Sequence, residues 1–536
     1  MKFKIFSITS VIILILSGLI ITPPSRGDNV KQDINQQSEI PIDMDFTLDT
    51  INKLTGIIQQ KDQNGSFIYW QGRDFGTPGE REAARILKEE VWDEHIAKNN
   101  ENIPNATLDK IEGERLTRKV GVESQNDYNL TFFFGNEELR PPKSEYFPVR
   151  DHEEGIHIFS NAKVHITPNW AYGLIKTEDK ETISDKISRF LDKSSYHIYL
   201  IEMEKIEQML GYPKKGEYSF LDVVKRLACF TNADAFLFAD YFDDTHFMTP
   251  AVCDIPGMTI NGSLGKKIKN SIKNGISVEA DFYINTKELF VESYNVIGTI
   301  PGEVDDIVFV GAHYDSMWCQ GACDDSCSVA ITFAIAKYFS DNHIKPYYTL
   351  KFAAWAGEEY PPKRGSASYI NKYKNEEIYK YCFCLAALGF KNSSIPKENI
   401  GLNFWSIRRM PKNFKDEVKK IDYTMISGGY RNTVINERFY SLLWYAVDAQ
   451  SFFKHTISGV FCFAKGTSYV PLKDFYHRDG NNHTKGDTLE IADFDDVNAT
   501  AQVALSVIKK ASEKPDYPIF YKLLSKIVKI KNNLIK

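Results

Sequence analysis

The chain has 536 residues, a length that predicts several domains or one domain enlarged by an insertion. Hydrophobic residues make up 43% of the chain and charged residues 25%, which is ordinary for globular proteins and predicts that most of it folds. The formal net charge of −6 is small for this length, and the sequence has no long basic stripe with interleaved aromatic residues. Composition therefore argues against a nucleic-acid-binding protein.

The N-terminus has the layout of an export signal. Lys2 and Lys4 precede an uncharged run over residues 5–22, and Pro-Pro-Ser-Arg follows the run. A run of this length fits a secretory signal and also approaches the lower limit for a membrane span. Residues 1–26 are predicted to be a signal peptide or signal anchor, followed by a polar linker over 27–45. The protein is expected to be extracytoplasmic, either secreted or anchored by this segment.

The pattern turns helical from residue 46. Thr77 is a predicted N-cap, Pro78 suits a first turn, and a helix is expected from near Glu80 to about Trp92. Residues 46–100 are assigned to the N-terminal part of the main domain. Residues 101–285 place charged loops between short β-like runs, which predicts a smaller, inserted, β-rich domain; one continuous domain is the alternative.

Strands alternate with helices over residues 286–512. Buried strands are predicted at 307–312, 348–356 and 381–388, and a nearly all-apolar helix at 329–339. A helix-strand pattern recurs at 448–463, and a last helix is expected at 495–511. This alternation predicts an α/β fold with a mostly parallel or mixed sheet sandwiched by helices. Residues 513–536 form a basic amphipathic tail that either lies on an anionic membrane or docks on the protein itself.

Side chains suited to metal chemistry stand where these strands end. Open α/β sheets build their sites at the carboxyl ends of strands, and imidazole with carboxylates is a natural set of zinc ligands. The residues therefore predict a metal-dependent hydrolase. Three cysteines at four-residue spacing (319, 323 and 327) are interpreted as disulfide-bonded or buried thiols in preference to ligands. The succession along the chain is His313 and Asp315, Asp324, Glu358 and Glu359, and finally His483.

Four motifs carry a resemblance to a known family. They are Gly-Ala-His-Tyr-Asp-Ser (311–316), Gly-Ala-Cys-Asp-Asp (321–325), Gly-Glu-Glu (357–359) and His-Thr-Lys-Gly-Asp-Thr (483–488). The chain resembles the co-catalytic zinc exopeptidases of clan MH, which include bacterial leucyl aminopeptidases, glutamate carboxypeptidase II and glutaminyl cyclases. The similarity covers roughly 46–100 and 286–512, and the region between is similar to a protease-associated domain.

The resemblance implies a set of zinc ligands. His313 would bind one zinc, Asp324 would bridge two, and Glu359 with His483 would bind the other. His477 is the rival of His483 for the last position, but His483 has the family's sequence context. The implied cofactor is Zn²⁺, one or two ions per chain.

The resemblance also implies a general base, and the chain departs from the family at one ligand. Glu358 would take a proton from a metal-activated water, and Asp315 would orient His313. Where the family carries an aspartate ligand, this chain has Ala386, within Cys-Leu-Ala-Ala-Leu-Gly (384–389). Alanine cannot coordinate zinc, so the site of His313 is expected to be weakened.

Three functions are compatible with this scaffold. The first is an exported zinc aminopeptidase acting on peptides, with carboxypeptidase action left open. The second is a single-zinc acyltransferase that resembles glutaminyl cyclases, and the third is a non-catalytic binding protein such as the transferrin receptor. Retention of Glu358, Glu359 and His483 argues against the third, and the protease-associated-like insertion favours a peptidase. The expected partner is a peptide, with membrane association through either terminus possible.

Overall fold

The structure is a computed structural model that describes residues 41–112, 118–148, 154–168, 195–202, 205, 233–239, 255–359, 364–389, 402–406, 434–436, 448–452, 455–465 and 485–514. The predicted signal segment lies outside these residues, as do His477, His483 and most of the basic tail. In the part of the chain that is described, no helix has the length and apolar character needed to cross a membrane.

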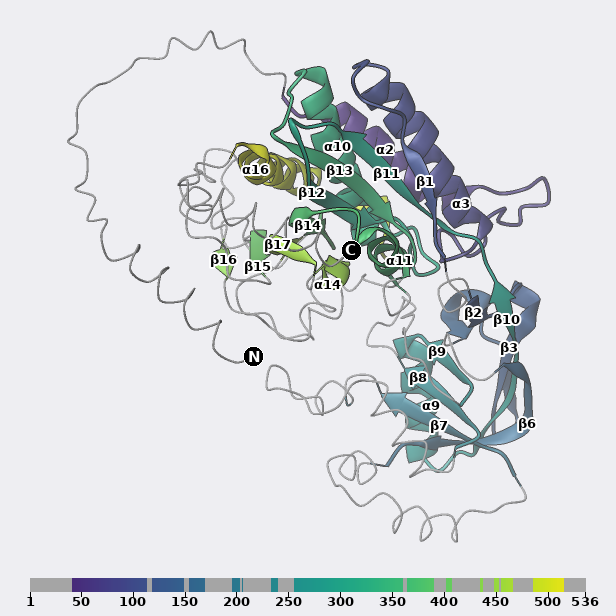
Figure 1. The fold of residues 1–536 in the computed structure, drawn as a ribbon. Helices are drawn as coiled ribbons and strands as arrows, with labels where there is room; N and C mark the ends of the chain where they lie inside the picture. The colour runs from purple at the N-terminus through teal and green to yellow at the C-terminus, as the bar shows by residue number, and fades with distance from the viewer. Residues whose placement is uncertain are drawn as a thin grey trace, which may run out of the picture. The chain divides into compact units, whose positions relative to one another are not determined.

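The predicted α/β domain is built on an eight-stranded mixed sheet (Figure 1). Its strands, in spatial order, are β1 (Thr107–Lys110), β11 (Tyr294–Ile300), β13 (Tyr348–Trp355), β12 (Val304–His313), β14 (Tyr379–Leu385), β17 (Thr456–Lys465), β15 (Leu402–Ser406) and β16 (Val434–Asn436). The central strands β13, β12, β14 and β17 are parallel, whereas β1, β11 and β15 pair antiparallel to their inner neighbours. The expected α/β fold with a mixed sheet is confirmed.

Both faces of this sheet are buried, because alternate residues of each strand enter different apolar clusters. In β12, Val308 and Val310 join one cluster, and Ile307 and Phe309 join the other. The first cluster also holds residues of α2 (Met44–Gly56), α3 (Pro78–Arg85), the π-helical continuation Ile86–Ala97, α10 (Cys327–Asp341) and α16 (Phe494–Ser512). The second holds residues of α11 (Arg364–Tyr373) and α14 (Ala449–Phe452).

The helix start predicted near Glu80 agrees with the structure, but the helix continues in π-helical form to Ala97, past the predicted end near Trp92. Thr77 caps α3 by accepting the backbone N–H of Glu80 at 3.2 Å, and Pro78 stands in the first turn.

One predicted strand also ends elsewhere than expected. The predicted strand over 381–388 instead ends at Leu385, because Ala387 has a φ of 52° that an extended strand cannot contain. Ala386 therefore lies in the loop that leaves the sheet.

A second, nine-stranded sheet occupies most of the predicted insertion. It contains β4 (Glu137–Leu139), β3 (Tyr128–Phe134), β10 (Val278–Phe290), β6 (Gly155–Ile166), β7 (His197–Glu202), β8 (Ala235–Ala239), β9 (Gly257–Ile260) and β5 (Tyr146–Pro148), and β2 (Arg118–Gly121) pairs with β10. Helix α9 (Gly262–Lys273) contributes to its apolar core, which also includes Met317, Trp318 and Cys319 from the segment after β12. The chain passes between the two sheets after β1 and again after β10. The limits 101–285 and the protease-associated character of this region stay predictions.

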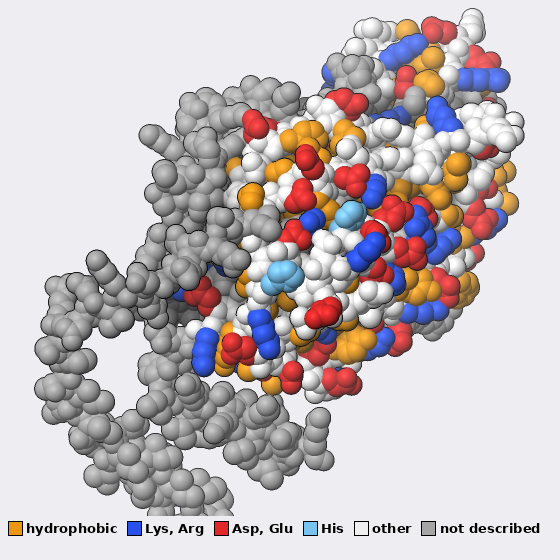
Figure 2. Space-filling view, turned by 90° about the horizontal axis from the view of Figure 1, so that it is seen from above, with side chains coloured by type: hydrophobic (Ala, Val, Ile, Leu, Met, Phe, Trp, Pro, Cys, Tyr) orange, Lys and Arg blue, Asp and Glu red, His pale blue; other side chains and the backbone are white. Residues whose placement is uncertain are grey.

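On the face drawn in Figure 2, acidic, basic and apolar side chains of the described residues are interspersed. Such mixing accords with the small net charge of −6. The described cysteines 319, 323, 327, 382 and 384 are buried free thiols.

Candidate metal centre

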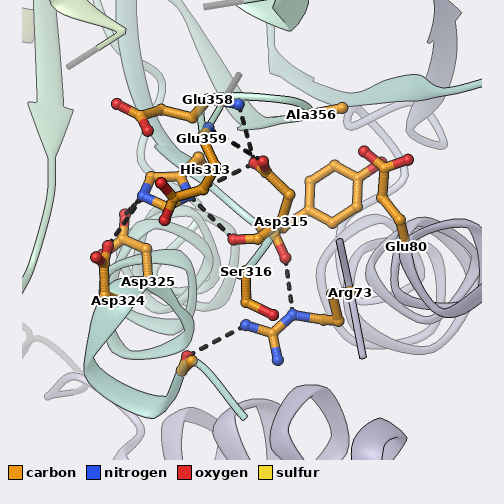
Figure 3. Close-up of polar contacts among 12 residues, drawn as sticks. Arg73, Glu80, His313, Asp315, Ser316, Asp324, Asp325, Ala356, Glu358 and Glu359 are labelled. Atoms are coloured by element: carbon orange, nitrogen blue, oxygen red, sulfur yellow. Dashed lines mark hydrogen bonds and ion pairs between the residues drawn. The ribbon is translucent and has the colours of Figure 1, made fainter. Parts of the chain in front are cut away.

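Two parallel strands bring the first set of predicted residues to one edge of the sheet. Strand β12 ends at His313, which is in register with Trp355, the last residue of the neighbouring β13. The loop after β13 therefore begins beside the loop after β12, and it carries Glu358 and Glu359. Figure 3 shows His313, Glu358 and Glu359 converging on this edge together with Asp324 from the following loop.

His313, Asp324 and Glu359 form a group that can hold a metal ion. One ligand atom from each lies within 4.8 Å of the others, and all three side chains are buried. His313 Nε2 lies 3.1 Å from Asp324 Oδ1. Two ligands on one tetrahedral zinc, at bond lengths near 2.1 Å, are about 3.4 Å apart. The spacing and the nitrogen-oxygen donor set thus fit zinc.

Asp315 forms hydrogen bonds both with His313 and with the loop that carries the two glutamates. The Nδ1 atom of His313 donates to the Asp315 carbonyl oxygen at 3.1 Å, which leaves Nε2 as the nitrogen directed at the metal group. The Asp315 carboxylate accepts the backbone N–H of Glu358 at 3.0 Å and that of Glu359 at 3.2 Å. Asp315 therefore sets the orientation of the imidazole and of the loop that carries the two glutamates.

Asp487 fixes the loop that presents Asp324. Its carboxylate accepts the backbone N–H groups of Cys323 at 2.8 Å and Asp324 at 3.0 Å. Burial raises the pKa of the Asp487 carboxyl to about 7. The structure thereby explains the Asp-Thr half of the motif at 483–488. His483, the fourth predicted ligand, lies outside the described residues, and so does its rival His477.

Arg73 connects the loops of the site by hydrogen bonds, and no sequence motif indicated this role. The buried guanidinium donates to the carbonyl oxygens of Tyr314 at 2.7 Å, Gln320 at 2.6 Å and Gly321 at 3.1 Å, and also to Leu54 at 3.0 Å. It therefore ties the end of β12 to the start of the Asp324 loop, as Figure 3 shows. Arg73 lies four residues before the predicted cap at Thr77, and no motif of the sequence indicated its contacts.

Asn295 and two glycines shape the loop of the glutamates. Asn295 Oδ1 accepts the Ala356 N–H at 3.3 Å, and its Nδ2 donates to the Gly365 carbonyl at 3.0 Å. A Cβ on Gly365 would lie 2.2 Å from Asn295 Oδ1, and a Cβ on Gly357, where φ is 64°, would lie 2.6 Å from the Phe75 ring. Only glycine fits at these two positions.

The site concentrates buried negative charge. Burial alone lowers the pKa of His313, but the charges of Asp325 and Glu358 outweigh it, so this pKa lies well above its ordinary value. Burial, together with the neighbouring Asp324, raises the pKa of Asp325 well above its ordinary value. Burying carboxylate charge without a nearby positive charge costs free energy of folding, and a bound dication would offset this cost. The buried carboxylates are those of Asp315, Asp324, Asp325, Glu358 and Glu359.

Ala386 is buried beside this group. The next residue, Ala387, donates its backbone N–H to Asp325 Oδ1 at 3.0 Å. The loop after β14 thus reaches the site at the place where the family's aspartate is expected, and its described residues, 386–389, bring no ligand there.

Comparisons with known proteins agree with this geometry. Residues 295–508 match the model of peptidase family M28. The fold is similar to that of a zinc aminopeptidase from Bacillus subtilis (16% identity, 90% of this chain and 98% of that chain, TM-score 0.58) and of an aminopeptidase from Aneurinibacillus sp. strain AM-1 (17%, 89% and 96%, TM-score 0.52). It is also similar to a peptidase M28 precursor from Shewanella amazonensis (15%, 88% and 94%, TM-score 0.55).

These comparisons confirm the resemblance and the fold expected from the sequence. No curated protein is significantly similar to the chain in sequence. Because the sequence identities are below 20%, the similarity to the solved structures establishes the fold alone. The family match, the zinc aminopeptidase fold and the His-Asp-Glu donor group together support zinc as the cofactor.

Proposed function

Because residues 295–508 match peptidase family M28 and the fold is that of zinc aminopeptidases, we propose that this chain is an exported zinc peptidase that removes N-terminal residues from peptides. The observation that carries the proposal is the buried group of His313, Asp324 and Glu359, with Glu358 on the same loop. A group of this kind has metal-assisted hydrolysis as its natural chemistry.

The proposed zinc ligands divide into two sets that share Asp324. Asp324, Glu359 and His483 would hold one ion, with a position left open, as in catalytic zinc sites. His313 and Asp324 would hold the other. Zinc bound there would polarise the scissile carbonyl and lower the pKa of water.

Glu358 is the proposed general base. Its side chain is buried, and its backbone N–H donates to Asp315 Oδ1 at 3.0 Å. This hydrogen bond fixes the backbone of Glu358 and does not involve the oxygens of its carboxylate. In the proposed reaction, Glu358 takes a proton from the attacking water and delivers it to the leaving amine. The buried setting excludes bulk water and strengthens these charge interactions.

Export and substrate end are also parts of the proposal. The run over residues 5–22 supports export. The similarity of the fold to the aminopeptidases of Bacillus subtilis and Aneurinibacillus supports action at a free amine. A carboxypeptidase or a glutaminyl cyclase would share the scaffold but recognise a different end of the substrate.

A panel of matched peptides tests the proposal. Each peptide is offered with a free N-terminus, with an acetylated N-terminus and with an amidated C-terminus. We expect hydrolysis of the free-amine and amidated forms and none of the acetylated form. Cleavage that requires a free carboxylate would identify a carboxypeptidase, and cyclisation of N-terminal glutamine without hydrolysis would identify a cyclase.

A further inference from the structure

The loss of the aspartate at position 386 leaves His313 and Asp324 as the only predicted ligands of one metal. Two protein ligands are fewer than zinc sites normally use. Even so, the imidazole of His313 is held in one orientation. Its Nδ1 donates to the Asp315 carbonyl oxygen, and its Nε2 faces Asp324. The structure offers a further carboxylate at this place, that of Asp325.

Asp325 is fully buried, and its two oxygens face different groups. Oδ1 accepts the backbone N–H of Ala387 at 3.0 Å, which places the carboxylate directly beside Ala386. Oδ2 lies 3.7 Å from His313 Nε2 and has no hydrogen bond of good geometry within the described part of the chain, although the Ser328 hydroxyl lies near the carboxylate. An acceptor oxygen buried in this state is costly unless a cation or donor reaches it.

The distances around His313 Nε2 are close to those between ligands on one metal ion. Nε2 lies 3.1 Å from Asp324 Oδ1 and 3.7 Å from Asp325 Oδ2. Ligands bound at about 2.1 Å, with angles between 90° and 120° at the metal, are roughly 3.0 to 3.6 Å apart. The distance to Asp324 lies within this range, and the distance to Asp325 lies just above it. Figure 3 shows both aspartates on the side of His313 that carries this nitrogen.

We propose that Asp325 supplies the carboxylate ligand that the chain lacks at Ala386. One imidazole and two carboxylates then hold the metal of the His313 side, with Asp324 shared between the two ions. The inference rests on the proposed zinc centre. Its alternative is that Asp325 acts only as an acceptor that anchors the loop after β14 through Ala387.

Zinc stoichiometry distinguishes these two roles without any assay of activity. Asp325→Asn has the same size and retains an oxygen that can accept the Ala387 N–H, but it removes the negative charge and one ligand oxygen. The double variant Asp325→Asn, Ala386→Asp returns a carboxylate at the family's position. Asp306→Asn, on β12 and in an ion pair with Lys380 at 2.9 Å, is the matched control.

We expect two zinc ions per chain in the parent and the control, one in Asp325→Asn, and two again in the double variant. Zinc titration should show that Asp325→Asn lowers the affinity of the weaker of the two zinc sites by a factor of about 100 or more relative to the parent. After substitution of cobalt for zinc, the visible absorption of one cobalt centre should be lost in Asp325→Asn and should return in the double variant.

Two results would overturn the inference while leaving the zinc centre standing: two zinc ions in Asp325→Asn, or one zinc in the parent that rises to two with Ala386→Asp alone. A parent chain that binds no zinc would overturn the metal centre and this inference together. Circular dichroism of each variant verifies that lost zinc does not reflect lost folding.

Discussion

The carboxylate of Asp315 accepts the backbone N–H of Glu358 across 3.0 Å, although 42 residues separate the two in sequence. Asp315 follows β12 and Glu358 follows β13, so this hydrogen bond joins the loops of two neighbouring parallel strands. Since Asp315 also accepts the His313 Nδ1–H through its carbonyl, the proposed ligand and the proposed base are held on one residue.

Asp315→Asn should therefore disturb both functions. The Asn amide nitrogen cannot accept an N–H, so one backbone donor of Glu358 or Glu359 loses its partner. We expect a loss of roughly 10- to 100-fold in zinc affinity and in kcat/KM, and of about 1–3 kcal/mol in stability. Zinc titration and urea unfolding measure these. Unchanged zinc affinity would show that Asp315 does not position the ligands.

Glu358→Gln should separate chemistry from metal binding. Glutamine retains the size of the side chain but cannot take up the proton, so kcat should fall by about 10²- to 10⁴-fold while zinc content stays the same. Glu376→Gln, at an exposed position after α11, is the control and should leave both quantities unchanged. Turnover that survives in Glu358→Gln would remove this residue from the mechanism.

Arg73→Met should destabilise the fold because it leaves several buried carbonyl oxygens without their donor. The guanidinium donates to Leu54, Tyr314, Gln320 and Gly321, and no other side chain has this fork of donors. We expect a loss of about 3 kcal/mol or more in the free energy of unfolding, measured with urea.

The exposed Arg81 provides the comparison for this variant. Arg81 donates to the Gly76 carbonyl at 3.1 Å at the surface, and Arg81→Met should change stability by no more than about 0.5 kcal/mol. Equal effects of the two substitutions would show that the buried contacts of Arg73 contribute little.

The nine-stranded sheet should lose stability in mild acid through His165. Burial, reinforced by His197 and Lys163, lowers the pKa of His165 to about 4 from 6.5. The unfolded chain therefore binds a proton between these values that the folded chain does not. The contribution of His165 falls as pH decreases from about 6.5 to about 4, and it is constant above and below that window.

Unfolding free energies of His165→Gln, measured from pH 7 to pH 4, test this sign. The variant should lose less stability across the window than the parent, because Gln does not titrate. His157→Gln, on the same strand β6, is the control. A parent and a His165→Gln variant with parallel pH curves would contradict the account.

The sequence predicted those features that depend on local pattern. The apolar run that became α10, the cap at Thr77 and the strands β12 and β13 all follow from periodicity and capping within a few residues. The approach of His313 to Glu359 also follows, because parallel neighbouring strands end at one edge. The ligand roles assigned to these residues stay predictions.

Contacts set by loop placement could not be predicted in this way. The fork of Arg73 reaches carbonyl oxygens more than 240 residues away, and the pairing of Ala387 with Asp325 depends on a positive φ that ends β14 early. The same holds for β10, whose partners β3 and β6 precede it by more than a hundred residues. No local pattern encodes such partners.

The zinc content of the chain purified without added metal, read beside hydrolysis of a free-amine peptide before and after chelation, tests the central claim most directly. The account predicts two zinc ions per chain, loss of hydrolysis on chelation and its return with zinc. Absence of zinc, or hydrolysis that persists after complete metal removal, would contradict it.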